Sequence, residues 1–293
     1  MPVVWTVLEI VAPVFLLAAV GFAWVRLGLE YRVEFVTRLA MTLSVPCLIF
    51  VALMEARIDP AALTALTLAA LAAYAAVIAV TWGLVALSGL ERRTWLAPLA
   101  FGNTGNLGLP LALFAFGQEG LSLAVVVFAV MAILSFTLGV WFVSGGGNPV
   151  GVLREPMVAA TLLGALFLWF GWSTPRFLTE TLRLAGQMAI PLMLITLGVA
   201  VARLRPAALG RPALLSLVKL GVCIAAAWAA GRWFGLGPVP FAVLVLQVAT
   251  PVAVTSYLLA EKYGADADAV AGLVVVSTLL SVGALPLLLG ILL

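Results

Sequence analysis

The sequence predicts an all-α membrane protein of ten transmembrane helices, arranged as two five-helix repeats that enter the membrane in opposite orientations. Three observations predict this fold class: the apolar composition, the division of the chain into ten apolar blocks, and a similarity between its two halves. Of the 293 residues, 65% are hydrophobic and 9% are charged, and the mean hydropathy is +1.25. A soluble domain of this size has too little interior to hide so much apolar surface. The expected surroundings are therefore a lipid bilayer.

Ten apolar blocks are separated by charged or turn-rich stretches, and each is close to the ~20 residues that cross a bilayer. The first block lacks the basic start and the cleavage pattern of a signal peptide, so it is expected to remain as a span. The longest polar interruption, 144–156, is only a connecting loop, so no soluble domain is expected. The predicted spans are 4–26, 35–54, 61–87, 94–117, 120–143, 153–172, 182–202, 212–234, 238–261 and 267–292.

Basic residues are distributed unevenly between the two sides of this topology. Lys and Arg concentrate in cytoplasmic loops, so the richer side is predicted to be cytoplasmic and both termini to lie outside the cytoplasm. The loops after odd-numbered spans hold Arg26, Arg32, Arg38, Arg92, Arg93, Arg154, Arg203, Arg205, Arg211 and Lys262, and the other side holds Arg57, Arg176, Arg183 and Arg232.

The two halves of the chain resemble each other at a nearly constant offset, which predicts repeats spanning 1–146 and 147–293. Because each repeat holds five spans, an odd number, the second must be inverted relative to the first. The matching segments are RLAMTLSVPCLIF (38–50) with RLAGQMAIPLMLI (183–195), PVFLLAAVG (13–21) with PMVAATLLG (156–164), and ILSFTLG (133–139) with LLSVGAL (279–285).

The fourth and ninth spans are expected to be broken at equivalent positions. The stretch FGNTGNLGLPL (101–111) places three glycines, two asparagines and a proline in the fourth span, and the same offset leads to QVATPVAVTSY (247–257) in the ninth. Each glycine weakens a helix by roughly 1 kcal/mol relative to alanine, and proline removes a backbone donor. Freed backbone groups at this depth are tolerated only inside protein or beside a wet cavity. Paired interruptions therefore predict a binding site.

The chemistry expected at these breaks favours an anion. Thr250 and Pro251 read as the N-cap and first residue of a helix, and Pro110 is expected to begin the second half of the fourth span in a similar way. Each second half then points a partially positive N-terminus at mid-membrane. A carboxylate would suit Asn103, Asn106 and the backbone amides as donors. The alternative is that the kinks only allow close helix packing, but two kinks at equivalent positions favour a site.

Three motifs carry a family resemblance over essentially the whole chain. They are N-T-G-x-x-G-x-P from Asn103 to Pro110, A-T-P followed by S-x-x-L-A-x-x-Y-G from Ala249 to Gly264, and S-T-x-x-S with a later proline at Ser277, Thr278, Ser281 and Pro286. With these motifs the chain resembles the bacterial branch of the auxin efflux carrier family of transporters. The resemblance implies a location in the bacterial inner (plasma) membrane and a fold related to bile-acid and sodium–proton transporters.

The same resemblance implies how such a protein works. The fourth and ninth spans would cross at their broken centres in a transport domain formed by spans three to five and eight to ten. The first, second, sixth and seventh spans would form a scaffold and a homodimer interface.

The resemblance also implies a substrate class. Members of the family move small organic anions, indole acetate in plants and malate or malonate in bacteria. Asn103 matches the asparagine that contacts the substrate carboxylate, and Pro251 matches the ninth-span proline. The long loop of the plant carriers between the fifth and sixth spans is missing here. The substrate-binding candidates are Asn103, Thr104, Gly105, Asn106, Pro110, Thr250 and Pro251.

The driving force is predicted to be the substrate gradient or the membrane potential. Moving one charge across 100 mV is worth roughly 2.3 kcal/mol. Hydroxyl and carbonyl oxygens without a formal negative charge bind Na⁺ weakly, although symport with Na⁺ or H⁺ remains an alternative. Lys219 is the one charge well inside a span, and such residues are functional candidates by default. The candidates for an ion or coupling site are Gln247, Ser135, Ser277, Thr278, Ser281 and Lys219.

Other function classes are less favoured by the composition. The chain has no histidine, and its two cysteines fall within predicted spans, so no metal or cofactor is expected. The aspartates Asp59, Asp266 and Asp268 lie beside loops, which argues against an intramembrane aspartic protease, and no enzyme is predicted. No nucleic-acid partner is expected. An anion channel stays open, because broken helices also build pores; a carrier saturates and shows counterflow, whereas a pore conducts. A structural or receptor role predicts no flux.

Overall fold

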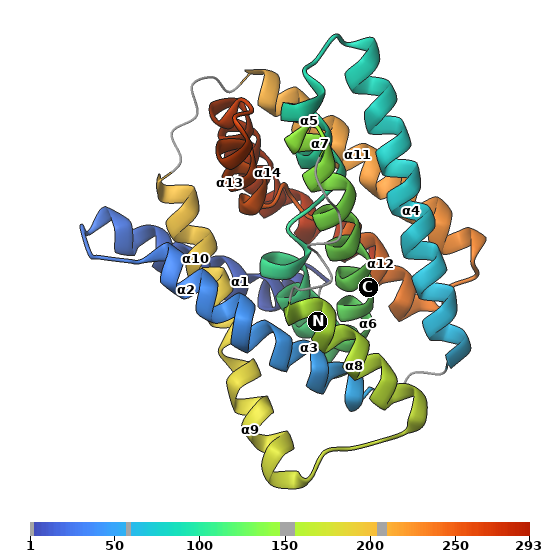
Figure 1. Ribbon diagram of the computed structural model, residues 1–293. Coiled ribbons are helices and arrows are strands. Elements are labelled where there is room, and N and C mark those ends of the chain that lie inside the picture. Colours follow the sequence, from blue (N-terminus) through green and yellow to red (C-terminus); the bar gives the residue numbers. More distant parts are fainter. Residues whose placement is uncertain (1–2, 57–59, 147–155, 204–209) are drawn as a thin grey trace.

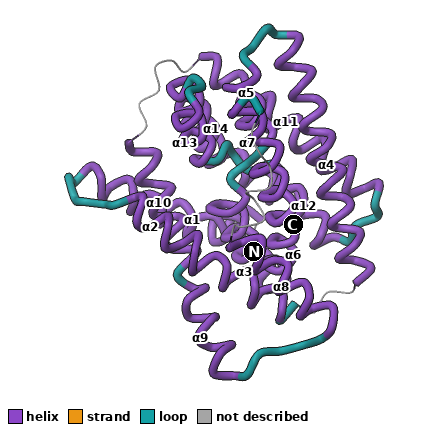
Figure 2. Tube along the Cα trace, in the orientation of Figure 1, coloured by secondary structure: helices purple, strands orange, loops and turns teal. Residues whose placement is uncertain are grey.

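The computed structural model describes residues 3–56, 60–146, 156–203 and 210–293. In these ranges the chain forms helices joined by short connections, with one isolated β-bridge and no strand, which confirms the all-α prediction (Figures 1 and 2). Three of the basic residues used above to predict the orientation, Arg57, Arg154 and Arg205, lie outside the described residues.

The helices of the first half run from the N-terminus to residue 144. Three short π-helical turns, which hold one extra residue per turn, interrupt them. The elements are α1 (Val3–Arg26), α2 (Val33–Leu39), η1 (Ala40–Ser44), α3 (Val45–Met54), α4 (Pro60–Leu87), α5 (Arg92–Ala100), η2 (Thr104–Gly108), α6 (Leu109–Leu134), η3 (Ser135–Gly139) and α7 (Val140–Ser144).

The second half is built from seven described helices. The longest two, α11 and α14, are unbroken, whereas the stretch between α12 and α13 is extended. The elements are α8 (Pro156–Phe170), α9 (Arg176–Gln187), α10 (Ala189–Arg203), α11 (Gly210–Trp233), α12 (Pro238–Val248), α13 (Val254–Tyr263) and α14 (Ala267–Leu292).

Seven helical segments of the described chain are long and apolar enough to cross a membrane. They are Val7–Arg26, Val33–Met54, Ala61–Leu87, Thr104–Ser144, Arg176–Arg203, Gly210–Trp233 and Ala267–Leu292. Three predicted spans have no continuous helix of that length: 94–117 and 238–261 are interrupted, and the described part of 153–172 holds the 15-residue helix α8. The apolar helices support an integral membrane protein, and the count of ten spans stays a prediction.

One of the seven segments, Thr104–Ser144, contains a turn in the middle of α6. Gly117 has φ 63° and ψ −153°, which is not helical. A positive φ of this kind is readily adopted by glycine and strained for other residues. The chain therefore changes direction between the predicted spans 94–117 and 120–143.

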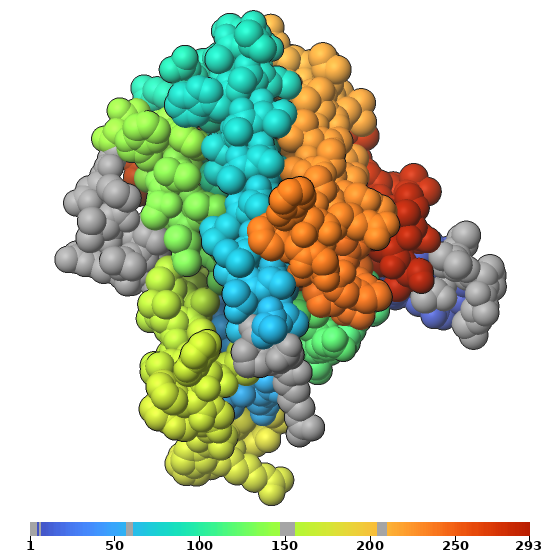
Figure 3. All heavy atoms as spheres, turned by 90° about the vertical axis from the view of Figure 1, so that its right-hand side faces the viewer, coloured from blue at the N-terminus to red at the C-terminus, as the bar shows by residue number. Residues whose placement is uncertain are grey.

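Two sets of helices pack closely in different parts of the molecule. In one, α1 lies along α10, and α3 packs on α8 and α9; in the other, α4 packs on α11 and α6 on α12. Figure 3 shows α4 and α11 side by side across one face. A Cβ at Gly21 would overlap the Ile195 carbonyl, and one at Gly198 would overlap the Ala18 carbonyl. Small residues thus let the backbones of α1 and α10 approach closely.

Arg93 joins three helix ends on the side of the arginine-rich loops. Its Nε donates to the Val143 carbonyl at 3.0 Å, and its Nη2 donates to the Tyr263 carbonyl at 2.6 Å. These carbonyls lie at the C-terminal ends of α7 and α13, where backbone acceptors have no helical partner. Next to it, the Thr94 hydroxyl accepts a hydrogen bond from the Asp266 backbone amide at 3.1 Å. The ends of α5, α7 and α13 are therefore held together with the start of α14.

Candidate functional site

The two interrupted segments, 101–103 and 249–253, meet near the middle of the bundle (Figure 1). We call them the bridge segments, because Gly102 and Val252 form an antiparallel β-bridge. The Asn103 backbone amide donates to the Pro251 carbonyl at 2.7 Å. Extended backbone inside a membrane protein needs such partners, since lipid offers none.

Gly102 is required for this close approach. A Cβ at this position would overlap the hydroxyl of Thr250 and lie 2.9 Å from its carbonyl oxygen. On the opposite side, the Ser277 hydroxyl accepts a hydrogen bond from the Val252 amide at 3.0 Å, so α14 supports the second bridge segment. The bridge is thus fixed by backbone contacts and by one hydroxyl, and a side chain larger than hydrogen does not fit at residue 102.

The predicted helix start at Thr250 and Pro251 is wrong. Helix α13 begins at Val254, with Ala253 still extended (φ −71°, ψ 140°). The bridge to Gly102 holds the chain extended as far as residue 252. The Thr250 hydroxyl instead donates to the Gln247 carbonyl at 2.7 Å, at the C-terminal end of α12. Thr250 therefore closes the preceding helix and does not begin the following one.

The break in the fourth span lies earlier than Pro110, although this proline does lie in the first turn of α6, as expected. Phe101 is extended (φ −112°, ψ 138°), and the π turn η2 follows directly. The Asn103 carbonyl accepts from the amides of Leu107 at 3.1 Å and Gly108 at 3.3 Å. Pro110 lies in the first turn of α6, after the π turn has already restarted the helical winding.

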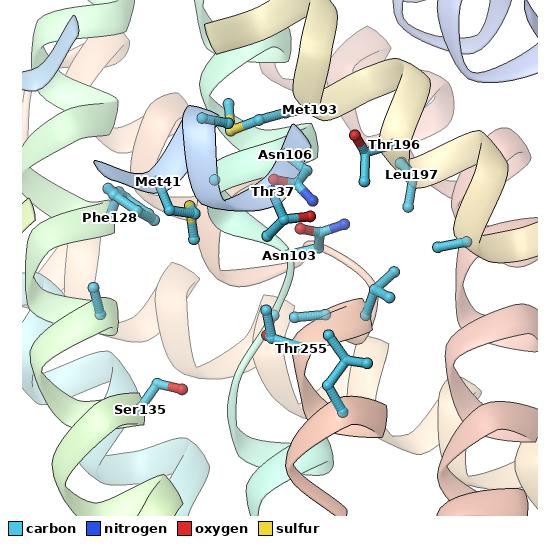
Figure 4. Close-up of a pocket in the computed structure, with 18 of the residues that line it drawn as sticks. Thr37, Met41, Asn103, Asn106, Phe128, Ser135, Met193, Thr196, Leu197 and Thr255 are labelled. Atoms are coloured by element: carbon cyan, nitrogen blue, oxygen red, sulfur yellow. The ribbon is translucent and has the colours of Figure 1, made fainter. Parts of the chain in front are cut away.

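A cavity of about 100 Å³ lies beside the bridge (Figure 4). It runs from the bridge toward the start of α2 and the end of α10. None of the described residues that line it is charged. The polar members are Thr37, Asn103, Asn106, Ser135, Thr196 and Thr255, and the larger apolar members include Met41, Phe128, Met131, Phe136, Met157, Met193, Leu197 and Leu258.

The amide of Asn103 is the most informative group in this cavity. Asn103 is only 4% exposed, and its Nδ2 has no hydrogen-bond partner among the described residues. Buried polar atoms are nearly always paired, so an unpaired donor calls for an explanation. Figure 4 shows Asn103 and Asn106 converging with Thr37 on one region of the cavity. The two amides lie in or beside η2, whereas Thr37 comes from α2.

Two helix N-termini open into the same cavity. Gly105 and Asn106, from the start of η2 and α6, line one part, and Val254 and Thr255, from the first turn of α13, line another. Helix N-termini carry unpaired amides and partial positive charge. Together with the free Nδ2 of Asn103, the cavity offers donors to a ligand that accepts hydrogen bonds.

The other predicted substrate residues take different places. Thr104 is fully buried and its hydroxyl has no partner among the described residues, but Thr104 does not line the cavity. Pro110 does not line it either. Thr250 and Pro251 line a smaller cavity of about 20 Å³. The structure thus brings Asn103, Gly105 and Asn106 of that set together in the larger cavity.

The residues predicted for ion coupling are also divided. Lys219, Ser277 and Ser281 line the smaller cavity, whereas Ser135 lines the larger one. Thr278 is buried with its hydroxyl unpaired. Gln247 is fully buried, and neither atom of its amide has a partner in the described chain. A Cβ at Gly108 would overlap that amide, so Gln247 lies against the backbone of η2.

Several wall residues were not predicted from the sequence. Thr37 and Thr196 are single hydroxyls in apolar helices, and Thr196 already donates to the Leu192 carbonyl at 2.6 Å, as many helical threonines do. A signal did exist in the backbone: all three π turns of the described chain contribute lining residues. Such turns are frequent at functional sites. The residue pattern alone did not predict these π turns.

Tyr31, in the loop between α1 and α2, contacts Thr196 of the cavity wall. Its hydroxyl is 2.7 Å from the Thr196 hydroxyl, and its carbonyl accepts from Arg203 Nη2 at 2.7 Å. Burial raises the pKa of Tyr31, and the Thr196 hydrogen bond and the charge of Arg203 oppose this rise only in part. The phenol is therefore neutral at physiological pH and links the loop to α10.

A third cavity, of about 630 Å³, lies on the side away from the arginine-rich loops. Arg183 of α9 pairs there with Glu55, which follows α3. Gln118 and Gln187 also line it, as does Ser122, which donates to the Ala52 carbonyl at 3.0 Å. This cavity is therefore more polar than the cavity beside the bridge, although most of its lining residues are apolar.

Comparison with known proteins places the chain among transporters. A family model described as "Membrane transport protein" matches residues 6–151 and 148–289. The chain belongs to this family, the auxin efflux carriers. An uncharacterised transporter of Methanothermobacter thermautotrophicus is 29% identical over 295 residues, covering 95% of this chain and 96% of that protein. An uncharacterised transporter of Methanocaldococcus jannaschii is 28% identical over 196 residues, covering 61% and 62%.

Membership in the auxin efflux carrier family settles the general activity. The protein is an integral membrane transporter, and its family is not a class of enzymes. The apolar helices described above agree with this assignment.

Proposed function

We propose that this protein is a secondary carrier that moves a small organic carboxylate across the membrane by alternating access. The carboxylate would bind in the cavity beside the bridge, and the substrate class would be that of indole acetate, malate or malonate. Ten helices in a five-plus-five inverted repeat, with the fourth and ninth spans crossing at the bridge, would form the framework. The first, second, sixth and seventh spans would form the scaffold of a homodimer.

One observation carries this proposal: Asn103 lines the cavity, and its buried Nδ2 has no partner among the described residues. A carboxylate accepts hydrogen bonds from such a donor and from Asn106. It is also favoured by the partial positive charge at the starts of η2 and α13. The remaining wall, formed largely by methionine and phenylalanine side chains, suits the apolar body of an organic acid.

The cavity beside the bridge and the third cavity together suggest the route. The cavity beside the bridge extends toward Val33 and Ala200, near the loops that hold Arg32 and Arg203, and the positive-inside rule assigns this side to the cytoplasm. The third cavity, with Glu55 and Arg183, lies toward the other side. In this account the described state faces the cytoplasm of a bacterial inner membrane, and the substrate is exchanged with the other side after the bridge moves toward the third cavity.

Uptake into proteoliposomes tests the proposed function. We would measure labelled malate, malonate and indole acetate, each with an imposed Na⁺ gradient, pH gradient or membrane potential and without any gradient. A carrier of this kind shows counterflow, and its net uptake is saturable and responds to membrane potential without needing a gradient of Na⁺ or protons. Strict dependence on Na⁺ or protons would replace it with the symporter alternative. Non-saturating conductance would indicate an anion channel, and no flux of any of the three acids would contradict the substrate class.

A further inference from the structure

Lys219 lines the smaller cavity, to which the second bridge segment contributes Ala249, Thr250 and Pro251, whereas Ala253 of the same segment lines the larger cavity. The side chain comes from the middle of α11 and is only 5% exposed. Its Nζ is 3.6 Å from the Cys223 sulfur. Among the described residues, no Asp or Glu pairs with it within the 4.0 Å of an ion pair. Lys219 does not line the larger cavity either, so the carboxylate site described so far gives this charged residue no role.

The surroundings of Lys219 are those of a cation site. The Ser216 hydroxyl is buried and has no partner in the described chain, and Ser216, Thr250, Ser277 and Ser281 all line this cavity. Ala249, at the C-terminal end of α12, also lines it, and helix C-termini carry partial negative charge. A volume of about 20 Å³ is enough for one water molecule. The bridge thus presents helix N-termini to the larger cavity and a helix C-terminus to the smaller one.

We propose that the Lys219 ammonium is a resident cation that takes the place of a coupling ion and balances the charge of the bound carboxylate. This inference rests on the proposed carboxylate carrier. A second cation such as Na⁺ would be repelled from the hydroxyls of Ser277 and Ser281 by the ammonium in the same cavity. Helix α11 packs on α4, α12 and α14, so Lys219 moves with the bridge wherever these contacts are kept.

The electrical consequence is specific. A carrier loaded with a monovalent carboxylate crosses with no net charge, because the ammonium and the carboxylate cancel. The empty carrier returns with one positive charge. Membrane potential therefore acts on the empty step and changes net uptake, but it does not change the one-for-one exchange of substrate. Without the ammonium the assignment reverses: the loaded step becomes charged and the empty step neutral.

The first experiment needs no substrate. Wild-type protein reconstituted in a planar bilayer should give a transient charge displacement after a voltage step, because the empty carrier moves Lys219 through the field. Lys219→Gln should abolish the transient, and Lys219→Arg should keep it. The matched control is Lys262→Gln, the same substitution at the chain's other lysine, which ends α13 over the Tyr263 ring; it should leave the transient unchanged. The proposal of a resident cation is wrong if the wild type gives no transient, or if Lys219→Gln gives a transient as large as that of the wild type.

The second experiment uses labelled indole acetate as a monovalent probe in proteoliposomes. Wild-type exchange should change by less than about twofold when a potassium diffusion potential is imposed, whereas a full charge crossing the field would change it many-fold. Lys219→Gln should make exchange dependent on the potential. If exchange depends equally on the potential in the wild type and in Lys219→Gln, the proposal of a resident cation is wrong, whereas the proposed carboxylate carrier is not contradicted. Absence of any carboxylate flux in the wild type, measured in the uptake panel above, counts against the proposed function instead.

Discussion

The two bridge segments both interrupt a helix and pair with each other, but they use their polar groups differently. Segment 101–103, with the π turn that follows it, leaves polar groups free: the Asn103 Nδ2 and the Thr104 hydroxyl have no partner in the described chain. Segment 249–253 uses its polar groups internally, since the Thr250 hydroxyl bonds the Gln247 carbonyl and the Val252 amide bonds Ser277. In the proposed function the first segment therefore faces the ligand, and the second segment holds the first in place.

Substitutions in the two segments should therefore affect different properties of the protein. Changes in the anchoring segment, or at the glycine that contacts it, should reduce the free energy of unfolding. Changes at the free amide should reduce transport and leave the fold in place. The predictions that follow test this division, beginning with the largest expected effect.

Gly102→Ala should cause the largest loss of folded protein. The added methyl group overlaps the Thr250 hydroxyl and carbonyl, and overpacking of this kind costs about 1–3 kcal/mol or more. The measurement is the thermal unfolding midpoint in detergent. Gly83→Ala in α4 is the matched control, because no atom lies within 4 Å of its new Cβ. Equal midpoints for the two variants would show that the bridge does not need glycine.

Asn103→Ala should reduce transport about ten- to a hundredfold, which corresponds to the loss of one hydrogen bond to a charged group. Because the Nδ2 has no partner in the described part of the chain, the unfolding midpoint should stay near that of the wild type. Initial uptake rates per folded protein provide the measurement. Loss of folded protein in this variant would show that Asn103 stabilises the fold, as the anchoring segment does, and would contradict its assignment as a ligand-binding residue.

Thr250→Ala should show the opposite pattern with a smaller effect. It removes the hydroxyl that closes α12, at an expected cost of about 1 kcal/mol in the free energy of unfolding. Transport per folded protein should fall far less than in Asn103→Ala. Chemical denaturation of the two variants side by side gives the comparison, and a greater loss of transport in Thr250→Ala would reverse the roles given to the two segments.

Tyr31 should contribute the smallest effect. Its pKa is raised above the ordinary value of 10.0, so the phenol stays neutral in both folded and unfolded states at physiological pH. Transport should therefore not change between about pH 6 and 8 on its account. Above pH 10 the unfolded chain ionises first, and folded stability should fall more steeply in the wild type than in Tyr31→Phe. Parallel stability curves would contradict the buried position of this hydroxyl.

The sequence predicted the location of the site better than its geometry. Glycine, asparagine and proline at mid-span predicted the interruptions, and Asn103 and Asn106 do line the cavity. The position of the break was misplaced, because proline is tolerated in the first turn of a helix, and the contact of Gly102 with Val252 decides where the chain is extended. Thr37 and Thr196 were missed, since only packing brings α2 and α10 to the cavity.

Counterflow of labelled carboxylate in proteoliposomes, comparing the wild type with Asn103→Ala and Thr250→Ala, tests the central claim most directly. The account predicts transient accumulation of label in the wild type, a reduced but clear overshoot in Thr250→Ala, and none in Asn103→Ala at equal amounts of folded protein. An overshoot of wild-type size in Asn103→Ala would contradict the claim that the free amide beside the bridge holds the carboxylate.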